Sequence, residues 1–318
     1  MNNSLNIQPF RPGDEPAILE LFQQSFGCQL PEKVWAWRFR DNPSGQGLIE
    51  LCWDGDVLAA HYAVTAVVSR IAGQDYIIGL SGTTMTQSNY RGRGLFQILA
   101  RKIYKRMAES GMAMVWGFPN AISHRGFVKD LGWTDIYEIP MFRLALTSRS
   151  SLPSPGNETI EIQQFDLRFD KLWERVKDNS LIATKRDHKH LHWRYIKNPA
   201  ESYRVLAYID GDDLLGYVVL KRYKDEIHIV DLLTVQDEEI GIHLISKAVQ
   251  FGLRDSATIV SLWLNVTHPL HHALERFGFN NGEPVTYFGA LLLQPGLQES
   301  YIYDFRRWFM TMGDSDVF

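Results

Sequence analysis

The sequence repeats itself at a fixed distance, and this repeat constrains the fold more than any other feature. Three short motifs recur without gaps at an offset of 156 residues: Trp37-Arg38 as Trp193-Arg194, Asn42-Pro43 as Asn198-Pro199, and Asp54-Gly55-Asp56 as Asp210-Gly211-Asp212. Gapless matches of this kind indicate that the same supersecondary unit occurs twice. A chain of 318 residues is also long enough for two ordinary domains. The sequence therefore predicts two tandem domains.

The domain boundaries follow from the repeat and from local composition. The stretch from Thr147 to Thr159 is rich in Ser and Pro, which is typical of a linker. The predicted organisation is a first domain at 1–146, a linker at 147–159, a second domain at 160–292, and a C-terminal helix with an acidic tail at 293–318. Within each domain the Asp-Gly pair predicts a hairpin turn between two strands.

A loop of glycines and arginines lies where a predicted strand becomes a helix. The apolar stretch from Tyr76 to Met85 runs into Arg91-Gly92-Arg93-Gly94, and apolar residues then recur at helical spacing from Leu95 to Met107. The first N–H groups of a helix have no intrahelical partner, so with the helix dipole they favour an anion. Glycines let the backbone approach a phosphate, and arginines add charge-assisted hydrogen bonds.

Two common phosphate-binding loops do not fit this stretch. A P-loop needs Gly-Lys-Ser/Thr where this chain has Gly94-Leu95-Phe96, and a dinucleotide fingerprint needs a third glycine where it has Gln97. A plain Gly/Arg turn before a surface helix is the remaining alternative to a phosphate-binding loop.

The segment Arg91 to Phe96 resembles the R-x-x-G-x-G/A signature of the GNAT superfamily of acetyltransferases, with Phe96 in place of the last small residue. Its surroundings match as well: Asn120 follows a predicted strand, and a predicted helix over 121–130 closes at Gly132-Trp133. The resemblance implies an α/β (α+β) fold of two tandem GNAT-like domains. Each domain would be a mixed, mostly antiparallel sheet flanked by helices.

The resemblance also implies acetyl-CoA as the cosubstrate and a set of residues that contact it. These are Thr84, Met85, Thr86, Arg91, Gly92, Arg93, Gly94, Leu95, Phe96, Asn120 and Ser123. Asn120 has a second interpretation as a helix cap, since Asn accepts hydrogen bonds from free N–H groups, and one residue could do both.

The second copy of the loop differs in charge. Its counterpart, Val235 to Gly241, keeps one glycine and contains Asp237, Glu238 and Glu239. Carboxylates oppose the binding of phosphates. Only the first domain is therefore expected to bind acetyl-CoA, while the second shapes the acceptor cleft.

The catalytic groups are the least defined part of the resemblance. Many GNAT enzymes place a tyrosine where this chain has Val128, and Ser123 and His124 are nearby alternatives. N-myristoyltransferases, also tandem GNAT folds, use their terminal carboxylate as the base. By that analogy Asp316, the Phe318 carboxylate or Asp314 would accept the amine's proton, and the alternative is a solvated acidic tail.

Composition limits the partners. The net charge of −4 gives no general attraction to nucleic acid or to an anionic membrane. Two cysteines are too few for a disulfide framework, which suggests a reducing compartment. The histidines at 188, 190 and 192 have no acidic or thiol residue at ligand spacing, so no metal site is expected. We expect a cytoplasmic protein without a metal, and the sequence predicts no oligomeric state.

The expected function is transfer of an acetyl group from acetyl-CoA to a primary amine of a small acceptor, such as an amino sugar or an aminoacyl group. The alternative is a non-catalytic CoA-binding or scaffold protein that kept the fold. An aminoacyltransferase that uses charged tRNA is less supported, because it needs no intact CoA loop and net acidity disfavours tRNA.

Overall fold

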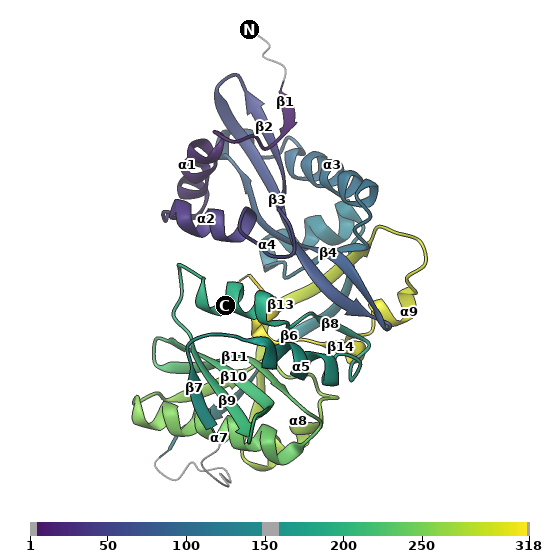
Figure 1. Ribbon diagram of the computed structural model, residues 1–318. Helices are drawn as coiled ribbons and strands as arrows, with labels where there is room; N and C mark the ends of the chain where they lie inside the picture. Colours follow the sequence, from purple (N-terminus) through teal and green to yellow (C-terminus); the bar gives the residue numbers. More distant parts are fainter. Residues whose placement is uncertain (1–4, 148–158, 317–318) are drawn as a thin grey trace. The chain divides into compact units, whose positions relative to one another are not determined.

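The computed structural model describes residues 5–147 and 159–316, and its chain forms two compact units (Figure 1). Of the described residues, unit 1 comprises 5–69, 75–137 and 287–303, and unit 2 comprises 70–74, 138–147, 159–286 and 304–316. Each unit therefore contains chain segments that are far apart in the sequence.

Unit 1 is built on strands in the order β1-β2-β3-β4-β5-β13. β1 and β2 are antiparallel, as are β2 and β3, whereas β4 and β5 run parallel and β13 returns antiparallel to β5. The bounds are β1 Asn6–Pro9, β2 Leu48–Asp54, β3 Val57–Ile71, β4 Gln74–Thr86, β5 Met114–Gly117 and β13 Asn280–Leu292, of which the part from Tyr287 belongs to unit 1.

Helices cover both faces of the unit 1 sheet (Figure 1). Alternating residues of β3 serve the two faces: Ala63 packs with Ile18 and Trp35 of α1 and α2, while Tyr62 and Val64 pack with α3. The bounds are α1 Glu15–Phe26, α2 Glu32–Phe39, the 3₁₀ turn η1 Ser88–Tyr90, α3 Leu95–Glu109, α4 Ala121–Arg125, the π turn η2 Gly126–Asp130 and α9 Glu299–Ile302.

Unit 2 repeats this plan with strands in the order β7-β9-β10-β11-β12-β6. β11 and β12 are parallel and β6 is antiparallel to β12. The strand bounds are β6 Thr134–Ala145, β7 Thr159–Ile162, β8 Ile182–Thr184, β9 Arg204–Asp210, β10 Asp213–Tyr223, β11 Glu226–Thr234, β12 Ile259–Leu262 and β14 Trp308–Phe309.

The unit 2 core lies under the longest helix. Leu244 and Ala248 of α7 are fully buried against Val218 and Ile227 of the sheet. On the other side of β10, Tyr217 packs against Phe169 of α5 with ring centroids 5.4 Å apart. The bounds are α5 Leu167–Val176, α6 His188–Leu191, the π turn η3 His192–Ile196, α7 Glu238–Arg254, α8 Pro269–Arg276, η4 Phe305–Arg307 and η5 Met312–Asp314.

The repeated residues have equivalent local structures, which confirms the tandem architecture. Asn42 Oδ1 accepts the N–H of Ser44 at 2.8 Å, and Asn198 Oδ1 accepts the N–H of Ala200 at 2.9 Å. Both Asp-Gly turns have left-handed glycines, with φ of 59° and 58°. Glycine is required there because other residues rarely adopt positive φ.

The compact units and the predicted domain boundaries differ at two strands. From Glu138, β6 belongs to unit 2, and from Tyr287, β13 belongs to unit 1. Each of these strands therefore belongs to the unit that is built mainly from the other repeat. The units depend on which strands pair, and the repeated motifs do not specify this pairing locally. The predicted linker lies almost wholly outside the described residues.

The C-terminal helix predicted within 293–318 is short and does not extend over residues 303–309. α9 ends at Ile302, and Asp304 starts a separate turn by accepting the N–H of Arg306 at 3.1 Å. Trp308 and Phe309 then form β14, which pairs with β8. The aromatic and basic pattern fits a helix locally, but a strand partner from another part of the chain decides its conformation.

Candidate functional site

Two parallel strands pair over part of their length at the centre of the unit 1 sheet. β4 pairs with β5 at Gly79 and Leu80, and then continues to Thr86 as a neighbour of β3, beyond its pairing with β5. Thr83 has a left-handed backbone with φ of 55°, an unusual conformation for a non-glycine residue. A Cβ on Gly117, the last residue of β5, would lie 3.2 Å from the Ser81 carbonyl oxygen. The two strands are thus still close at Ser81, and β4 continues beyond the point where β5 ends.

The predicted phosphate-binding loop connects β4 to α3. Gly92 and Gly94 are both left-handed, with φ of 75° and 73°, and Gly94 is the N-cap of α3. Gly94 has no side chain to cap the helix, and the first turn of α3 has no acidic residue. A pocket of about 360 Å³ lies here, lined by Thr86, Tyr90, Arg91, Gly92, Gly94, Leu95, Phe96 and Gln97. The helix N-terminus is therefore open to an anion.

The loop is held in shape by its own side chains. Arg91 Nε donates to the Thr86 carbonyl at 3.4 Å, and Arg93 Nη2 donates to the Asn89 carbonyl at 3.2 Å. The Arg93 guanidinium also lies 4.9 Å from the centre of the Tyr90 ring. Both arginines are exposed, so their charge is available to a ligand.

Phe96, which departs from the family signature, has a compensating neighbour. A Cβ on Gly126 would lie 2.9 Å from Phe96 Cε1, closer than Cβ atoms normally approach. The ring also packs against Phe127, with centroids 5.1 Å apart. The absence of a side chain at Gly126 makes room for the large residue at the start of α3.

Asn120 is a helix cap. Its Oδ1 accepts the N–H groups of Ile122 and Ser123, each at 3.0 Å, and the hydroxyl of Ser123 at 3.1 Å. Asn120 thereby begins α4 directly after β5. Its contact with acetyl-CoA, and that of Ser123, stay predictions, as do the contacts of Thr84, Met85 and Thr86 on the part of β4 beyond its pairing with β5.

The predicted catalytic carboxylates lie at the chain end. Asp314 is buried in unit 2, where its Oδ2 accepts Arg186 Nη2 and the Thr311 N–H, both at 2.8 Å. Asp316 is exposed, and Phe318 lies outside the described residues. The carboxylate of Asp314 thus holds the tail in place, while a role in proton transfer stays a prediction for all three residues.

His124 has a defined environment in unit 1. Its Nε2 lies 2.7 Å from Asp135 Oδ1, and its ring stacks on Tyr287 at a centroid distance of 3.8 Å. Tyr287 comes from β13, 163 positions later in the chain, so the sequence pattern gave no sign of this stack.

A buried tyrosine network was not predicted from the sequence. The Tyr62 hydroxyl lies 2.8 Å from Ser81 Oγ and 2.9 Å from the Tyr104 hydroxyl, which accepts Trp133 Nε1 at 2.9 Å. Burial raises the pKa of both tyrosines, so their hydroxyls keep their protons. The members come from β3, β4, α3 and the loop before β6, and they share no local motif. Through Ser81 the network reaches the part of β4 that follows its pairing with β5.

His61 lies beside the irregular part of β4. Its Nδ1 is 2.8 Å from the Thr83 carbonyl oxygen and must therefore donate, which leaves Nε2 as an acceptor. The side chain is fully buried, and burial lowers the pKa of His61 to about 4. His61 is thus a neutral imidazole that supports the backbone at Thr83.

In unit 2 the helix equivalent to α3 is α7, and a side chain of the protein caps its N-terminus. Asp237 is the N-cap of α7, and its Oδ1 accepts the N–H groups of Glu239 and Ile240 at 2.9 and 3.4 Å. Glu238 and Glu239 add negative charge to the first turn. A carboxylate of the protein therefore satisfies the groups that α3 leaves open.

Comparison with known proteins agrees with this geometry. Residues 6–136 match the family model described as an acetyltransferase (GNAT) domain. No curated protein is similar to this chain in sequence. No helix in the described ranges is both long and apolar enough to cross a membrane.

Several solved structures share the fold. A conserved protein of unknown function from Enterococcus faecalis, a probable N-acyltransferase, has a TM-score of 0.72 and 12% identity over 91% of this chain and 73% of its own. A GCN5-related N-acetyltransferase from Anabaena variabilis has a TM-score of 0.72 and 12% identity over 92% and 73%. A tandem GNAT protein from the clavulanic acid biosynthesis pathway has a TM-score of 0.59 and 11% identity over 92% and 100%.

These findings support acyl transfer as the general activity of the fold. The open α3 N-terminus, the β4–β5 pairing, the family match and the tandem architecture agree with one another. Residues 6–136 thus match an acetyltransferase (GNAT) domain, and the solved structures share the fold over most of the chain.

Proposed function

We propose that unit 1 transfers an acetyl group from acetyl-CoA to a primary amine of a small acceptor, such as an amino sugar or an aminoacyl group. The observation that carries this proposal is the open N-terminus of α3 next to the end of the β4–β5 pairing. Acetyl-CoA supplies the activated acyl group when it is bound. The protein's task is to hold it, exclude water and remove a proton from the amine.

The residues present fit this cosubstrate. Gly92 and Gly94 leave the backbone accessible to a pyrophosphate, and Arg91 and Arg93 add two positive charges. The part of β4 from Thr84 to Thr86 lies beyond the pairing with β5, and its edge on that side is the proposed place for an extended, amide-containing arm. Leu95, Phe96, Asn120 and Ser123 complete the proposed set of contacts.

Proton removal is assigned to the chain end. Direct attack of an amine on a thioester requires positioning and a proton acceptor, and a carboxylate meets the second need. We assign this role to the Phe318 carboxylate or to Asp316. The carboxylate of Asp314 is engaged by Arg186, so Asp314 fastens the tail near its end.

Calorimetry with acetyl-CoA tests the cosubstrate site. One site per chain is expected, and Gly92→Asp with Gly94→Asp should abolish binding, because the change places carboxylates against phosphates. Two equivalent sites, or unchanged affinity in the folded double variant, would contradict the assignment. Thiol release across a panel of amines then separates an enzyme from the alternative, a scaffold that binds CoA without turnover.

Truncation tests the tail. Removal of residues 316–318 leaves the Asp314–Arg186 pair intact and should lower turnover about a hundredfold, while acetyl-CoA affinity barely changes. Extension past Phe318 is the matched control, since it removes the terminal carboxylate but keeps Asp316. Parent-like turnover in both variants would show that the proton acceptor lies elsewhere.

A further inference from the structure

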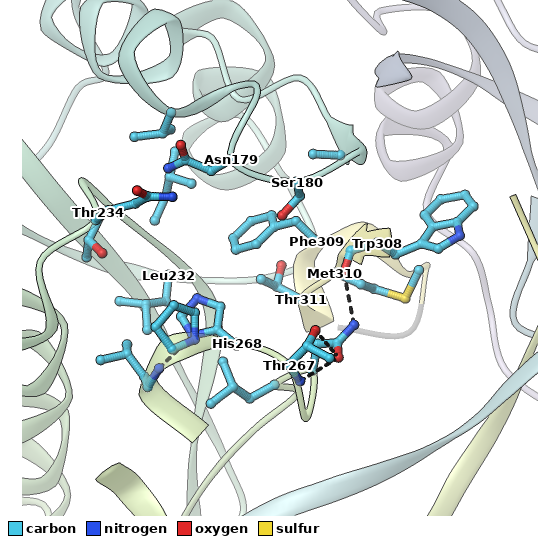
Figure 2. Close-up of a pocket in the computed structure, with 18 of the residues that line it drawn as sticks. Asn179, Ser180, Leu232, Thr234, Thr267, His268, Trp308, Phe309, Met310 and Thr311 are labelled. Carbon is cyan, nitrogen blue, oxygen red and sulfur yellow. Dashed lines mark hydrogen bonds between the residues drawn. The ribbon is translucent and has the colours of Figure 1, made fainter. Parts of the chain in front are cut away.

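Unit 2 contains a larger pocket than the one beside the α3 loop. Its volume is about 650 Å³, which is in the range of small-molecule sites (Figure 2). It lies between the C-terminal ends of β11 and β12, the end of α5 and the segment 306–311 near the chain end. All of these segments belong to unit 2.

The pocket occupies the place in unit 2 that corresponds to the end of the β4–β5 pairing in unit 1. The parallel pairing of β11 with β12 runs to Ile229 and Leu262, after which β11 continues to Thr234. Asn265 follows β12 as Asn120 follows β5, but its Nδ2 donates to the Phe305 and Trp308 carbonyls at 2.7 and 3.1 Å. Residues of the C-terminal segment thus form one wall of the pocket.

The charged residues that line the pocket have partners among neighbouring groups. Lys177 pairs with Glu174 and Glu238 with Arg276, Arg306 and Arg307 share Asp304, and Asp237 accepts N–H groups of α7. An uncharged ligand can enter the pocket and leave all of these contacts in place.

The remaining lining is apolar with hydroxyl and amide groups. Leu232, Trp308, Phe309 and Met310 supply apolar surface. Figure 2 shows Ser180 on the opposite side of the space from His268. This mixture of apolar surface and hydrogen-bonding groups suits a small organic molecule that has both.

His268 supplies a donor of fixed orientation. Its Nδ1 accepts the N–H of Leu270 at 3.2 Å as the N-cap of α8, so a neutral ring carries its hydrogen on Nε2. Burial lowers the pKa of His268 to about 4, and the ring is therefore neutral at pH 7. The Nε2–H can donate only to an acceptor such as a carbonyl oxygen.

We propose that this pocket is a second small-molecule site, for an uncharged molecule that combines apolar surface with a carbonyl or similar acceptor oxygen. Its ligand is chemically distinct from an acyl-CoA. The proposal rests on unit 2 alone and is independent of the function assigned to unit 1.

Titration with prodan, an uncharged naphthyl ketone with solvent-sensitive emission, tests the site in the full chain. Saturable binding of one molecule per chain with blue-shifted emission is expected. Thr234→Trp, which fills the pocket, should weaken binding at least tenfold. His268→Asn keeps a capping side chain but removes the imidazole donor, and should weaken binding about fivefold. If Thr234→Trp loses near-UV circular dichroism, Ser180→Leu takes its place.

Unit 1 provides the matched control. Gly92→Asp with Gly94→Asp should leave prodan affinity unchanged, and the pocket variants should leave acetyl-CoA affinity unchanged. The proposal is overturned if prodan does not saturate, if acetyl-CoA displaces it competitively, or if the folded pocket-filling variant binds it like the parent.

Discussion

At the scale of single residues, Arg186 shows how unit 2 holds charge in its interior. The guanidinium is 2% exposed, and its Nε lies 3.1 Å from Asp231 Oδ1. Tyr195 and Tyr217 donate to Asp231 Oδ2 at 3.0 and 3.1 Å. Because Arg186 also binds Asp314, this network joins the interior of the unit to the chain end.

Loss of Arg186 should strongly lower the stability of the protein. Arg186→Met leaves two buried carboxylates without a counter-charge, and we expect the free energy of unfolding to fall by about 3–5 kcal/mol in urea denaturation. The control is Arg204→Met, which removes an exposed pair with Glu161 and should change stability by about 1 kcal/mol or less. Similar losses in the two variants would contradict a buried, interdependent network.

His61 should make stability depend on pH. The pKa of His61 is about 4 in the folded protein and 6.5 in the unfolded chain, so unfolding takes up a proton between these values. Its contribution is complete above pH 6.5 and is lost as the pH falls to 4, by about 3 kcal/mol in total. His61→Asn should flatten the decline in unfolding free energy between pH 6.5 and 4. An unchanged slope would show that His61 is hydrated in the folded state.

At the scale of elements, α3 and α7 are equivalent helices whose N-termini differ in side-chain capping. α3 begins at Gly94 without a side-chain cap, whereas Asp237 caps α7. An uncapped helix start is less stable but can accept a ligand. The loop sequences predicted the difference in charge, and the structure adds that Asp237 acts as a cap.

Removal of the α7 cap should therefore affect stability and leave the function of unit 1 intact. Asp237→Ala should lower the unfolding free energy by about 0.5–2 kcal/mol, while Asp237→Asn should retain most of it because Asn also caps. Thermal denaturation measures the difference. Equal stability of the Ala and Asn variants would mean that the cap contributes nothing.

At the scale of the whole molecule, neither unit is one continuous segment. The edge of β5 in unit 1 is covered by β13, with Gly289 to Leu292 paired to Gly117 to Met114. Phe288 is fully buried and lies against Trp116 at 5.9 Å. The first repeat alone lacks these residues.

A fragment of residues 1–146 should accordingly fold poorly. It would leave the edge of β5 unpaired and expose Trp116, and an unpaired apolar edge promotes aggregation. We expect a low melting temperature and little acetyl-CoA binding. Fusion of residues 287–303 to this fragment through a flexible linker should restore much of both. Full stability of the fragment without the fusion would show that β13 is dispensable.

The sequence by itself determined the features that depend on neighbouring residues. The repeat, the Asp-Gly turns, the glycine-arginine loop before α3 and its acidic counterpart are all encoded within a few positions, because backbone conformation and helix capping are local. The predicted strand into that loop and the helix after it are present as β4 and α3.

Only the tertiary structure decided which distant segments pair. The exchange of β6 and β13, the strand at Trp308 in place of a helix, the Arg186 network and the pocket of unit 2 each join residues about a hundred positions or more apart. Such contacts are selected by burial and hydrogen bonding between whole elements, which leave no periodic signal in either partner. The local sequence pattern of a segment therefore limits the secondary structures that it can adopt, and its pairing partners decide which of them it adopts.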